Sequence, residues 1–177
     1  MMNKIKLDIQ RYKRLVGDNS DFNFRNYSMI LSPRLIPNLF YRISFYLNRK
    51  RYRRLSKIFS LFNVILFNIE IAAECEIGGG FFIPHTTGIV IGAKEIGCNC
   101  TIYQNVTIGA KELDMKYSAD KRPTIEDDVT IGTGAVVLGS ITIGTGSRIA
   151  ANSVVIKSVD KNELVGGVPA KHLRFIK

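Results

Sequence analysis

The stretch that decides the fold is RPTIEDDVTIGTGAVVLGSITIGTGSRIAANSVV, residues 122–155. Branched aliphatic residues recur in it at every sixth position, and glycine or alanine directly follows three of them. Neither a helix, with a period of 3.6 residues, nor a plain strand, with a period of 2, gives this spacing. A coil of short parallel strands does, because each side needs one large inward residue and a corner that tolerates glycine. The six positions are Ile125, Ile131, Val137, Ile143, Ile149 and Val155.

The same spacing extends upstream in two shorter blocks, which we expect to belong to the same coil. The gap from Ile83 to Val90 is one residue too long, and it contains Pro84 and His85. A second, longer gap holds a polar and charged segment, residues 109–124, which we predict to leave the coil as a loop. The upstream aliphatic positions are Ile71, Ile77 and Ile83, followed by Val90, Ile96, Ile102 and Ile108.

The net charge of +10 is not spread over the chain. Residues 1–70 hold fourteen Lys and Arg against four Asp and Glu, whereas residues 71–177 hold eleven of each. No nucleic-acid reading motif accompanies the basic part, so we expect no nucleic-acid partner. The three cysteines lack a CxxC spacing and indicate reduced residues of a cytosolic, hence cytoplasmic, protein.

The N-terminal part, residues 1–68, is predicted to be helical and basic. Apolar residues at helical spacing predict two amphipathic helices within 33–68, and one further helix is expected within 1–32. The apolar run 58–69 is too short to span a bilayer. Its basic neighbours form either a solvated turn or a patch that binds anionic lipid on the inner face of the plasma membrane. These basic residues are Arg49, Lys50, Arg51, Arg53 and Arg54.

His85 is one of only two histidines in the chain. A lone histidine is usually a surface residue or a satisfied core residue. Its place at the one-residue irregularity, beside small residues and facing the polar loop, favours a functional role instead. Imidazole is the side chain best suited to proton abstraction near neutral pH. We therefore predict that His85 is a general base.

Four motifs now carry a resemblance: IPHTTGIVIG, QNVTIG, GVPAK and the opening stretch. They resemble the serine acetyltransferase branch of hexapeptide-repeat acyltransferases, including relatives that O-acetylate bacterial sugars, over roughly residues 69–172. The resemblance implies a mainly β fold, a left-handed parallel β-helix over residues 69–158 followed by a tail, 159–177, packed on it. It also implies a homotrimer that uses acetyl-CoA as co-substrate and no metal. His85 would deprotonate an acceptor hydroxyl, which attacks the thioester directly.

The resemblance also implies roles for further residues. A backbone N–H at Gly109 would stabilise the oxyanion, and Lys171 would face the nucleotide phosphates or be an ordinary solvated lysine. Gln104 and Asn105 would contact the acceptor or form a stacked polar ladder. Arg122 would bind an anionic acceptor or brace the loop. The groove for the pantetheine arm would be lined by Thr133, Ala151, Ile156 and Lys157.

Two departures from the serine-specific pattern bear on the acceptor. Pro84 stands where that pattern has an acidic residue, and Arg122 stands where it has a second histidine. We therefore expect an O-acetyltransferase acting on a sugar hydroxyl of a nucleotide sugar, a lipid-linked glycan or a surface polysaccharide. The alternatives are serine O-acetylation for cysteine synthesis and a trimeric scaffold without activity.

Overall fold

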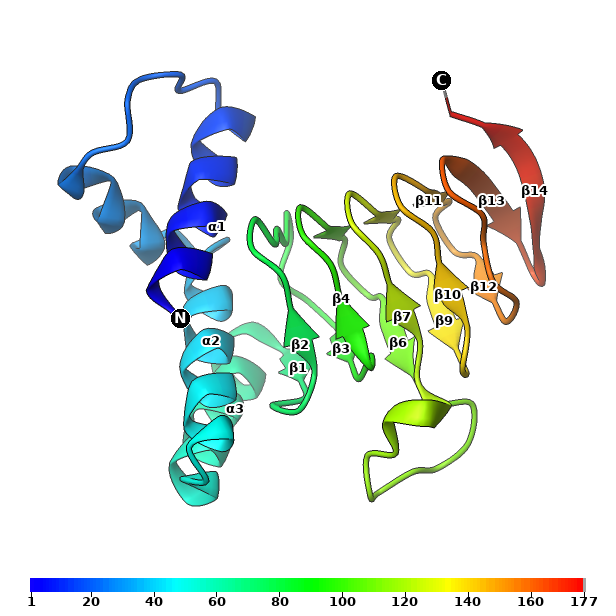
Figure 1. Cartoon of the computed structure of the whole chain (residues 1–177), viewed down its shortest axis with the longest axis horizontal. Helices are drawn as coiled ribbons and strands as arrows, with labels where there is room; N and C mark the ends of the chain where they lie inside the picture. The colour runs from blue at the N-terminus through cyan, green and yellow to red at the C-terminus, as the bar shows by residue number, and fades with distance from the viewer. Residues whose placement is uncertain (177) are drawn as a thin grey trace.

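A prism of short strands forms most of the chain, and helices close its N-terminal end (Figure 1). The computed structural model describes residues 1–176. Every strand pairs in parallel except the last, which confirms the predicted parallel β-helix. Sheet 1 contains β1 (Ile69–Ile71), β3 (Ile89–Ile91), β6 (Thr107–Gly109), β9 (Val136–Leu138) and β12 (Val154–Val155). Sheet 2 contains β2 (Glu76–Ile77), β4 (Glu95–Ile96), β7 (Thr124–Ile125) and β10 (Thr142–Ile143). Sheet 3 contains β5 (Thr101–Ile102), β8 (Thr130–Ile131), β11 (Arg148–Ile149), β13 (Glu163–Gly167) and β14 (Ala170–Phe175).

The interior of the prism consists of stacked aliphatic side chains. In sheet 3, Ile102 lies in register with Ile131, and Ile131 with Ile149. These side chains are at most 2% exposed. The predicted six-residue positions therefore form the hydrophobic core, because each coil places its inward residue directly on that of the previous coil.

One predicted core position is wrong. Val90 is 40% exposed, and its neighbours Ile89 and Ile91 are buried instead. Ile91 is in register with Ile71 on one side and Ile108 on the other. The turn after Ile83 thus adds two residues, and the next corner is one residue short. Because two added residues and one missing residue leave a net gap of one, the spacing in the sequence reveals neither change.

The corner between sheets 3 and 1 is built on an alternation of glycine and asparagine. Gly88, Asn105, Gly134 and Asn152 follow one another along it, and all have positive φ angles between 56° and 68°. The amide oxygen of Asn105 lies 2.4 Å from where a Cβ of Gly88 would be. Glycine is required there because this corner needs a left-handed backbone and has no room for a side chain.

Two corners of the prism flank sheet 1 and position the site. We call the corner between sheets 3 and 1 the His85 edge; it comprises residues 84–88, 103–105, 132–134 and 150–152. We call the corner between sheets 1 and 2 the loop edge; it comprises residues 92–94, 109–123, 138–141 and 156–158. The protruding loop, which contains the short helix η2 (Ala119–Lys121), starts from the loop edge (Figure 1).

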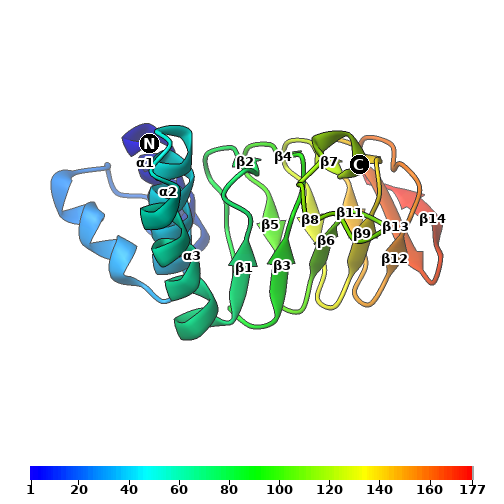
Figure 2. The ribbon, with the colours of Figure 1, turned by 90° about the horizontal axis from the view of Figure 1, so that it is seen from below.

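Helices cap the first coil, whose strand edges would otherwise be open. They are α1 (Met2–Leu15), η1 (Phe24–Leu31), α2 (Ile36–Arg49) and α3 (Arg53–Phe67), and Figure 2 shows them stacked at one end of the prism. Asn38 of α2 donates to the Phe81 carbonyl at 2.8 Å, and the Tyr41 hydroxyl donates to the Cys75 carbonyl at 2.5 Å. These contacts satisfy backbone groups that an edge coil leaves unpaired.

A buried ion pair joins α1 to α2. Arg42 contacts Asp8 at 3.1 Å, with side chains 4% and 1% exposed. Arg42 also donates to the backbone carbonyls of Ile77 and Gly78, and Asp8 accepts from the Phe81 amide. Burial raises the pKa of Asp8 despite the neighbouring guanidinium. The pair therefore ties both helices to the first coil, and it depends on both charges being present.

The prism continues beyond residue 158, where the sequence pattern placed its end. Val159 pairs with Ile143, and β13 pairs in parallel with β11. The side of the coil between Val155 and Val159 is shorter than six residues. The six-residue period of the sequence therefore ends there, although the coil itself continues. Within the predicted tail, β14 turns back antiparallel to β13 and covers its edge. Among the described helices none is both long and apolar enough to cross a membrane.

Candidate functional site

His85 lies in the turn where the prism departs from its period. The turn follows an isolated bridge at Phe82 and precedes β3. The imidazole is exposed at an open pocket of about 610 Å³. Across the described residues, no hydrogen bond occupies the ring nitrogens of His85. The ring is therefore free to accept a proton from a ligand. The pocket is lined by Tyr12, Ser32, Pro33, Arg34, Pro84, His85, Thr86 and Thr87.

Sequence reasoning missed half of this pocket. Arg34 donates through Nε to the Pro84 carbonyl at 3.2 Å, which places its guanidinium beside His85. Ser32 donates to the Tyr12 hydroxyl at 3.3 Å. That hydrogen bond, followed by the hydrogen bond and charge of Arg34, lowers the pKa of Tyr12. These residues reach His85 only because α1 and η1 fold back along the first coil, and no local motif signals that.

Gln104 and Asn105 lie one coil farther from the helical cap than the His85 turn. The Asn105 amide donates to the Thr87 carbonyl at 2.8 Å, and its side chain covers Gly88. Asn105 thus packs against Gly88 within the stacked corner, and its predicted contact with the acceptor stays a prediction. Gln104 is half-buried, and its side-chain oxygen has no partner among the described residues. Gln104 is therefore the better placed of the two to gain a hydrogen bond from a ligand.

Two predicted groove residues lie farther along the His85 edge. Thr133 donates through its hydroxyl to the Gln104 carbonyl at 3.1 Å. Ala151 follows in the next coil, where the neighbouring Asn152 amide donates to the Thr133 carbonyl. The structure thus brings His85, Gln104, Thr133 and Ala151 onto one edge of the prism.

Gly109 lies on the opposite edge of sheet 1. Its strand neighbour Ile108 accepts from the Gly92 amide, whereas Asn105 at the other end of the segment pairs with Thr87. Four extended residues separate the two edges, about 13 Å. Within one protomer, Gly109 therefore does not reach His85, and its predicted role at the oxyanion stays a prediction. A Cβ at Gly109 would meet no atom within 4 Å, so the surface outside it is open.

Arg122 also lies at the loop edge, and it braces the loop. Its guanidinium donates to the Gly92 carbonyl at 3.0 Å and pairs with Asp114 at 3.1 Å. The same group lies 3.8 Å from the centre of the Tyr117 ring. The side chain is only 10% exposed. These contacts correspond to the bracing alternative, and the buried Nε of Arg122 is left without a partner among the described residues.

The last three predicted cofactor residues share one pocket. Ile156, Lys157 and Lys171 line a hollow of about 260 Å³ at the C-terminal end of the prism. Lys157 and Lys171 are both exposed. His172, in the same hollow, contacts Glu163 at 2.7 Å through Nδ1. Two exposed cations beside an apolar wall suit the phosphates of a nucleotide.

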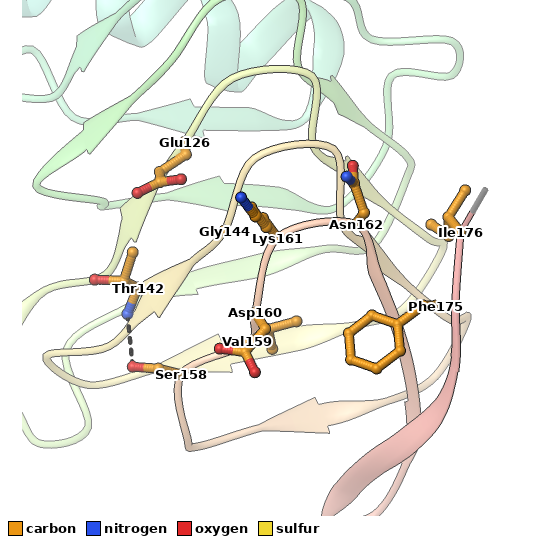
Figure 3. Close-up of a pocket in the computed structure, with 10 residues that line it drawn as sticks. All are labelled: Glu126, Thr142, Gly144, Ser158, Val159, Asp160, Lys161, Asn162, Phe175 and Ile176. Carbon is orange, nitrogen blue, oxygen red and sulfur yellow. Dashed lines mark hydrogen bonds between the residues drawn. The ribbon is translucent and has the colours of Figure 1, made fainter.

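A larger hollow, about 770 Å³, lies elsewhere (Figure 3). It is formed by the last coils near sheet 2, where the Thr142 amide donates to the Ser158 hydroxyl at 3.1 Å. It contains none of the predicted site residues and no imidazole. Volume alone therefore does not mark the site. The His85 pocket remains the candidate because, among the described residues, its imidazole has no hydrogen-bond partner and lies beside the fixed Arg34 guanidinium.

A repeat prism with an exposed imidazole at a break in its period defines a hexapeptide-repeat transferase. Residues 122–157 match the family described as bacterial transferase hexapeptide (six repeats). The chain is 42% identical to the serine acetyltransferase of Bacillus subtilis (strain 168), over 74% of this chain and 59% of that protein. It is 35% identical to the serine acetyltransferase of Helicobacter pylori (strain J99), over 81% of this chain and 82% of that protein. The chain belongs to the serine acetyltransferase family.

Solved structures agree with this placement. A serine acetyltransferase in complex with CoA superposes with a TM-score of 0.82 at 29% identity, covering 97% of this chain and 68% of that one. The chain spans about three-fifths of the length of the Bacillus subtilis relative.

The comparisons correct the expected acceptor. Relatives at 35% to 45% identity are serine acetyltransferases, so the predicted sugar acceptor, glycan partner and polysaccharide branch are wrong. Part of the error lies in Arg122. Its departure from the serine-specific pattern predicts a different acceptor, whereas its contacts are with Gly92 and with the loop.

Proposed function

We propose that this protein transfers the acetyl group of acetyl-CoA to the hydroxyl group of serine, with His85 as general base. The observation that carries the proposal is an exposed, unpaired imidazole held beside the Arg34 guanidinium in one pocket. The names of the relatives and the CoA complex of a structural neighbour support the two substrates.

The reaction needs one base and no covalent enzyme intermediate. His85 accepts the hydroxyl proton while the serine oxygen bonds to the acetyl carbon, and the carbon–sulfur bond then breaks. The proton returns from the imidazolium to the CoA sulfur, giving O-acetylserine and free CoA. A positioned general base of this kind contributes about 10²–10⁴ in rate.

The cysteines are poor candidates for a competing acyl-enzyme route. Burial raises the pKa of Cys75 and of Cys100 to about 12, so both thiols stay protonated and inaccessible. Because the thiolate is the nucleophilic form, neither can attack a thioester near neutral pH. Cys98 is exposed, but it lies at the corner between sheets 2 and 3, away from the His85 edge.

Arg34 is proposed to bind the serine carboxylate. Its Nε is fixed by the Pro84 carbonyl, so the remaining guanidinium nitrogens are presented at the pocket with little loss of freedom. A guanidinium–carboxylate hydrogen bond is charge-assisted and about twice as strong as a neutral one. A carboxylate held there would bring the serine hydroxyl close to His85.

The serine ammonium group needs an acidic partner that this pocket does not supply. None of the described residues lining it is Asp or Glu, and Pro84 occupies the position that is acidic in the serine-specific pattern. Exposed carboxylates lie instead on the loop, at Glu112 and Asp120. We propose that a neighbouring protomer's loop completes the pocket.

The outer face of sheet 1 supports such an assembly. Its outward column is Glu70, Val90, Thr107, Val136 and Val154, in continuous register, and beyond Glu70 it is apolar except at Thr107. The corresponding column of sheet 2 is polar, with Glu76, Glu95, Thr124 and Thr142. A cyclic trimer packed near sheet 1 would cover the valines and bring the His85 edge of one protomer to the loop edge of the next. Gly109 would then face His85 across the seam.

Acetyl-CoA fits this seam. Thr133 and Ala151 have small side chains, which leave room along the His85 edge. Ile156 and Lys157 lie on the loop edge, at the C-terminal end of the prism. The pantetheine arm would lie between the two protomers, and Lys157 and Lys171 would face the phosphates. The thioester would thereby reach the His85 end of the seam.

The proposal is tested by thiol release from acetyl-CoA in the presence of serine. Wild-type protein should turn over, and His85→Ala should lose at least about a hundredfold in kcat. The matched control is His172→Ala, which removes the other histidine and should retain kcat at saturating acetyl-CoA, because His172 lies in the phosphate hollow and not beside His85. Arg34→Gln should raise the KM for serine about tenfold or more, with a smaller effect on kcat, whereas Arg25→Gln on the same segment should not. Absence of serine-dependent release, or full activity of His85→Ala, would refute the proposal.

A further inference from the structure

Helix α3 is packed with its polar side inward. Its buried residues are Ser56 and Asn63, both 2% exposed. Ser44 of α2 donates to the Ser56 carbonyl at 3.0 Å, and Asn63 donates to the Pro37 carbonyl at 3.0 Å. Ser60 joins the same cluster at 2.8 Å from the Ser44 hydroxyl. A hydrogen-bonded seam, together with Phe59 and Phe67 at its margin, therefore attaches α3 to α2.

The opposite side of α3 is apolar and faces outward. We call it the α3 outer face, and its side chains are between 41% and 68% exposed. It is a convex strip along the helix and not a groove, and in Figure 2 the helix runs beside β1 at the capped end of the prism. Contiguous apolar surface of this kind marks an interaction site. The α3 outer face consists of Leu55, Ile58, Leu61, Phe62, Ile65 and Leu66, of which Phe62 lies at the margin and also contacts the Phe40 ring of α2.

The charge around this strip is of one sign. Residues 22–69 contain nine Lys and Arg and not one Asp or Glu. Five of these cations are exposed at the turn before α3 and in its first turns, and none takes part in an ion pair between described residues. We call them the basic turn: Lys50, Arg51, Arg53, Arg54 and Lys57.

We propose that the α3 outer face and the basic turn together bind the surface of an anionic lipid bilayer, with α3 lying in the plane of the interface. An amphipathic helix with an outward apolar side and adjacent Lys and Arg is the form that inserts at the boundary between headgroups and acyl chains. Each cation near an anionic surface adds to binding. The fifteen residues of α3 are too few to span the bilayer.

Charge distinguishes lipid from a second copy of the same segment. Two copies meeting through residues 22–69 would bring cations together with no acid on either side to balance them. An anionic bilayer is complementary both to the apolar strip and to the charge beside it. For the basic residues, the sequence pattern left two alternatives, lipid binding and a solvated turn. The apolar side of α3 faces outward, which only the packing reveals, and this favours lipid binding.

The inference is independent of acetyl transfer, and its test needs neither substrate. Full-length protein is sedimented with vesicles of phosphatidylcholine containing anionic phosphatidylglycerol, and with vesicles of phosphatidylcholine alone. We expect binding to the anionic vesicles that weakens as salt rises, and little binding to the neutral ones.

Arg51→Gln, Arg53→Gln and Arg54→Gln combined should reduce binding about a hundredfold, since each cation contributes about fivefold. Ile58→Asn with Ile65→Asn should reduce it at least tenfold.

Matched controls separate lipid binding from charge and folding. Arg148→Gln, Lys161→Gln and Arg174→Gln remove the same charge from exposed positions on the prism and should keep binding within a fewfold of wild type. All variants should keep the wild-type rate of serine-dependent thiol release. No binding to anionic vesicles at low salt, or equal losses in control and test variants, would overturn the proposal. So would a lower oligomeric mass of the Ile58→Asn, Ile65→Asn variant in sedimentation velocity without lipid, because the face would then be a subunit contact.

Discussion

The prism and helix α3 use the same aliphatic side chains in opposite directions. In the prism, residues such as Ile131 point inward and are fully buried, whereas Ile65 of α3 points outward and is 68% exposed. A coil has a closed interior, so its backbone geometry alone decides which residues are buried. A helix has no inside of its own. The side it buries is chosen by its neighbours, and here α2 offers Ser44 and the Pro37 carbonyl.

The largest expected effect comes from breaking the connection between the two regions. Arg42→Ala leaves the Asp8 carboxylate buried without its counterion and removes donors to the first coil. We expect the free energy of unfolding to fall by about 3–5 kcal/mol, measured by urea denaturation. Replacing the pair by Asp8→Leu with Arg42→Met should cost less than Arg42→Ala alone, because no charge is left buried. Arg174→Ala, an exposed control, should change little; a loss below about 1 kcal/mol for Arg42→Ala would show that the pair does not anchor the helices.

A matched pair of truncations compares the two regions directly. Ile131→Ala opens a cavity in the prism and should cost about 2–5 kcal/mol. Ile65→Ala removes a side chain that is mostly exposed and should change stability by less than about 0.5 kcal/mol. Urea midpoints of both variants measure the contrast. Similar losses at the two positions would mean that the α3 outer face is covered within the protein in solution.

A small effect is also expected at the surface between α1 and the prism. Lys4 pairs with Glu76 at 3.0 Å, and this hydrogen bond and charge lower the pKa of Glu76. A carboxylate whose pKa is lowered by folding adds stability above its ordinary pKa of 4.5, and that stability is lost as pH falls through the folded value. Lys4→Gln should therefore cost less than about 1 kcal/mol at neutral pH. The wild-type and variant stabilities should converge in acid, and a difference that grows in acid would contradict this account.

The sequence was sufficient for the prism and insufficient for the surroundings of its site. A six-residue period follows from local geometry, so it located the core and the exceptional turn at His85. The period failed at Val90, because a longer turn and a shorter corner nearly cancel in the spacing. It also failed at Val159, because a shortened side of the coil ends the six-residue period before the coil itself ends. Helical periodicity predicted that α3 exists and not which way it faces, because that depends on α2.

The site residues divide in the same way. His85 was identifiable because it interrupts a local pattern, and the shared edge of Thr133 and Ala151 follows from the stacking of coils. Arg34 and Tyr12 were not identifiable from the sequence, because only the return of the helical segment along the first coil brings them to the pocket. The role of Arg122 was left open between two alternatives that depend on contacts with Asp114 and Gly92, which no spacing reveals.

The measurement that tests the proposed shared site most directly is complementation between two inactive variants. His85→Ala disables the His85 edge, and Gly109→Phe blocks the loop edge from a position where a Cβ meets no atom of its own protomer within 4 Å. The two proteins are unfolded together, refolded at equal concentrations and assayed for serine-dependent thiol release, with each variant refolded alone as control. In random trimers, about a quarter of the seams combine an intact His85 edge with an intact loop edge, so we predict about a quarter of wild-type activity. Activity no higher than that of the separate variants, in mixed trimers shown to have formed, would contradict a site shared between protomers.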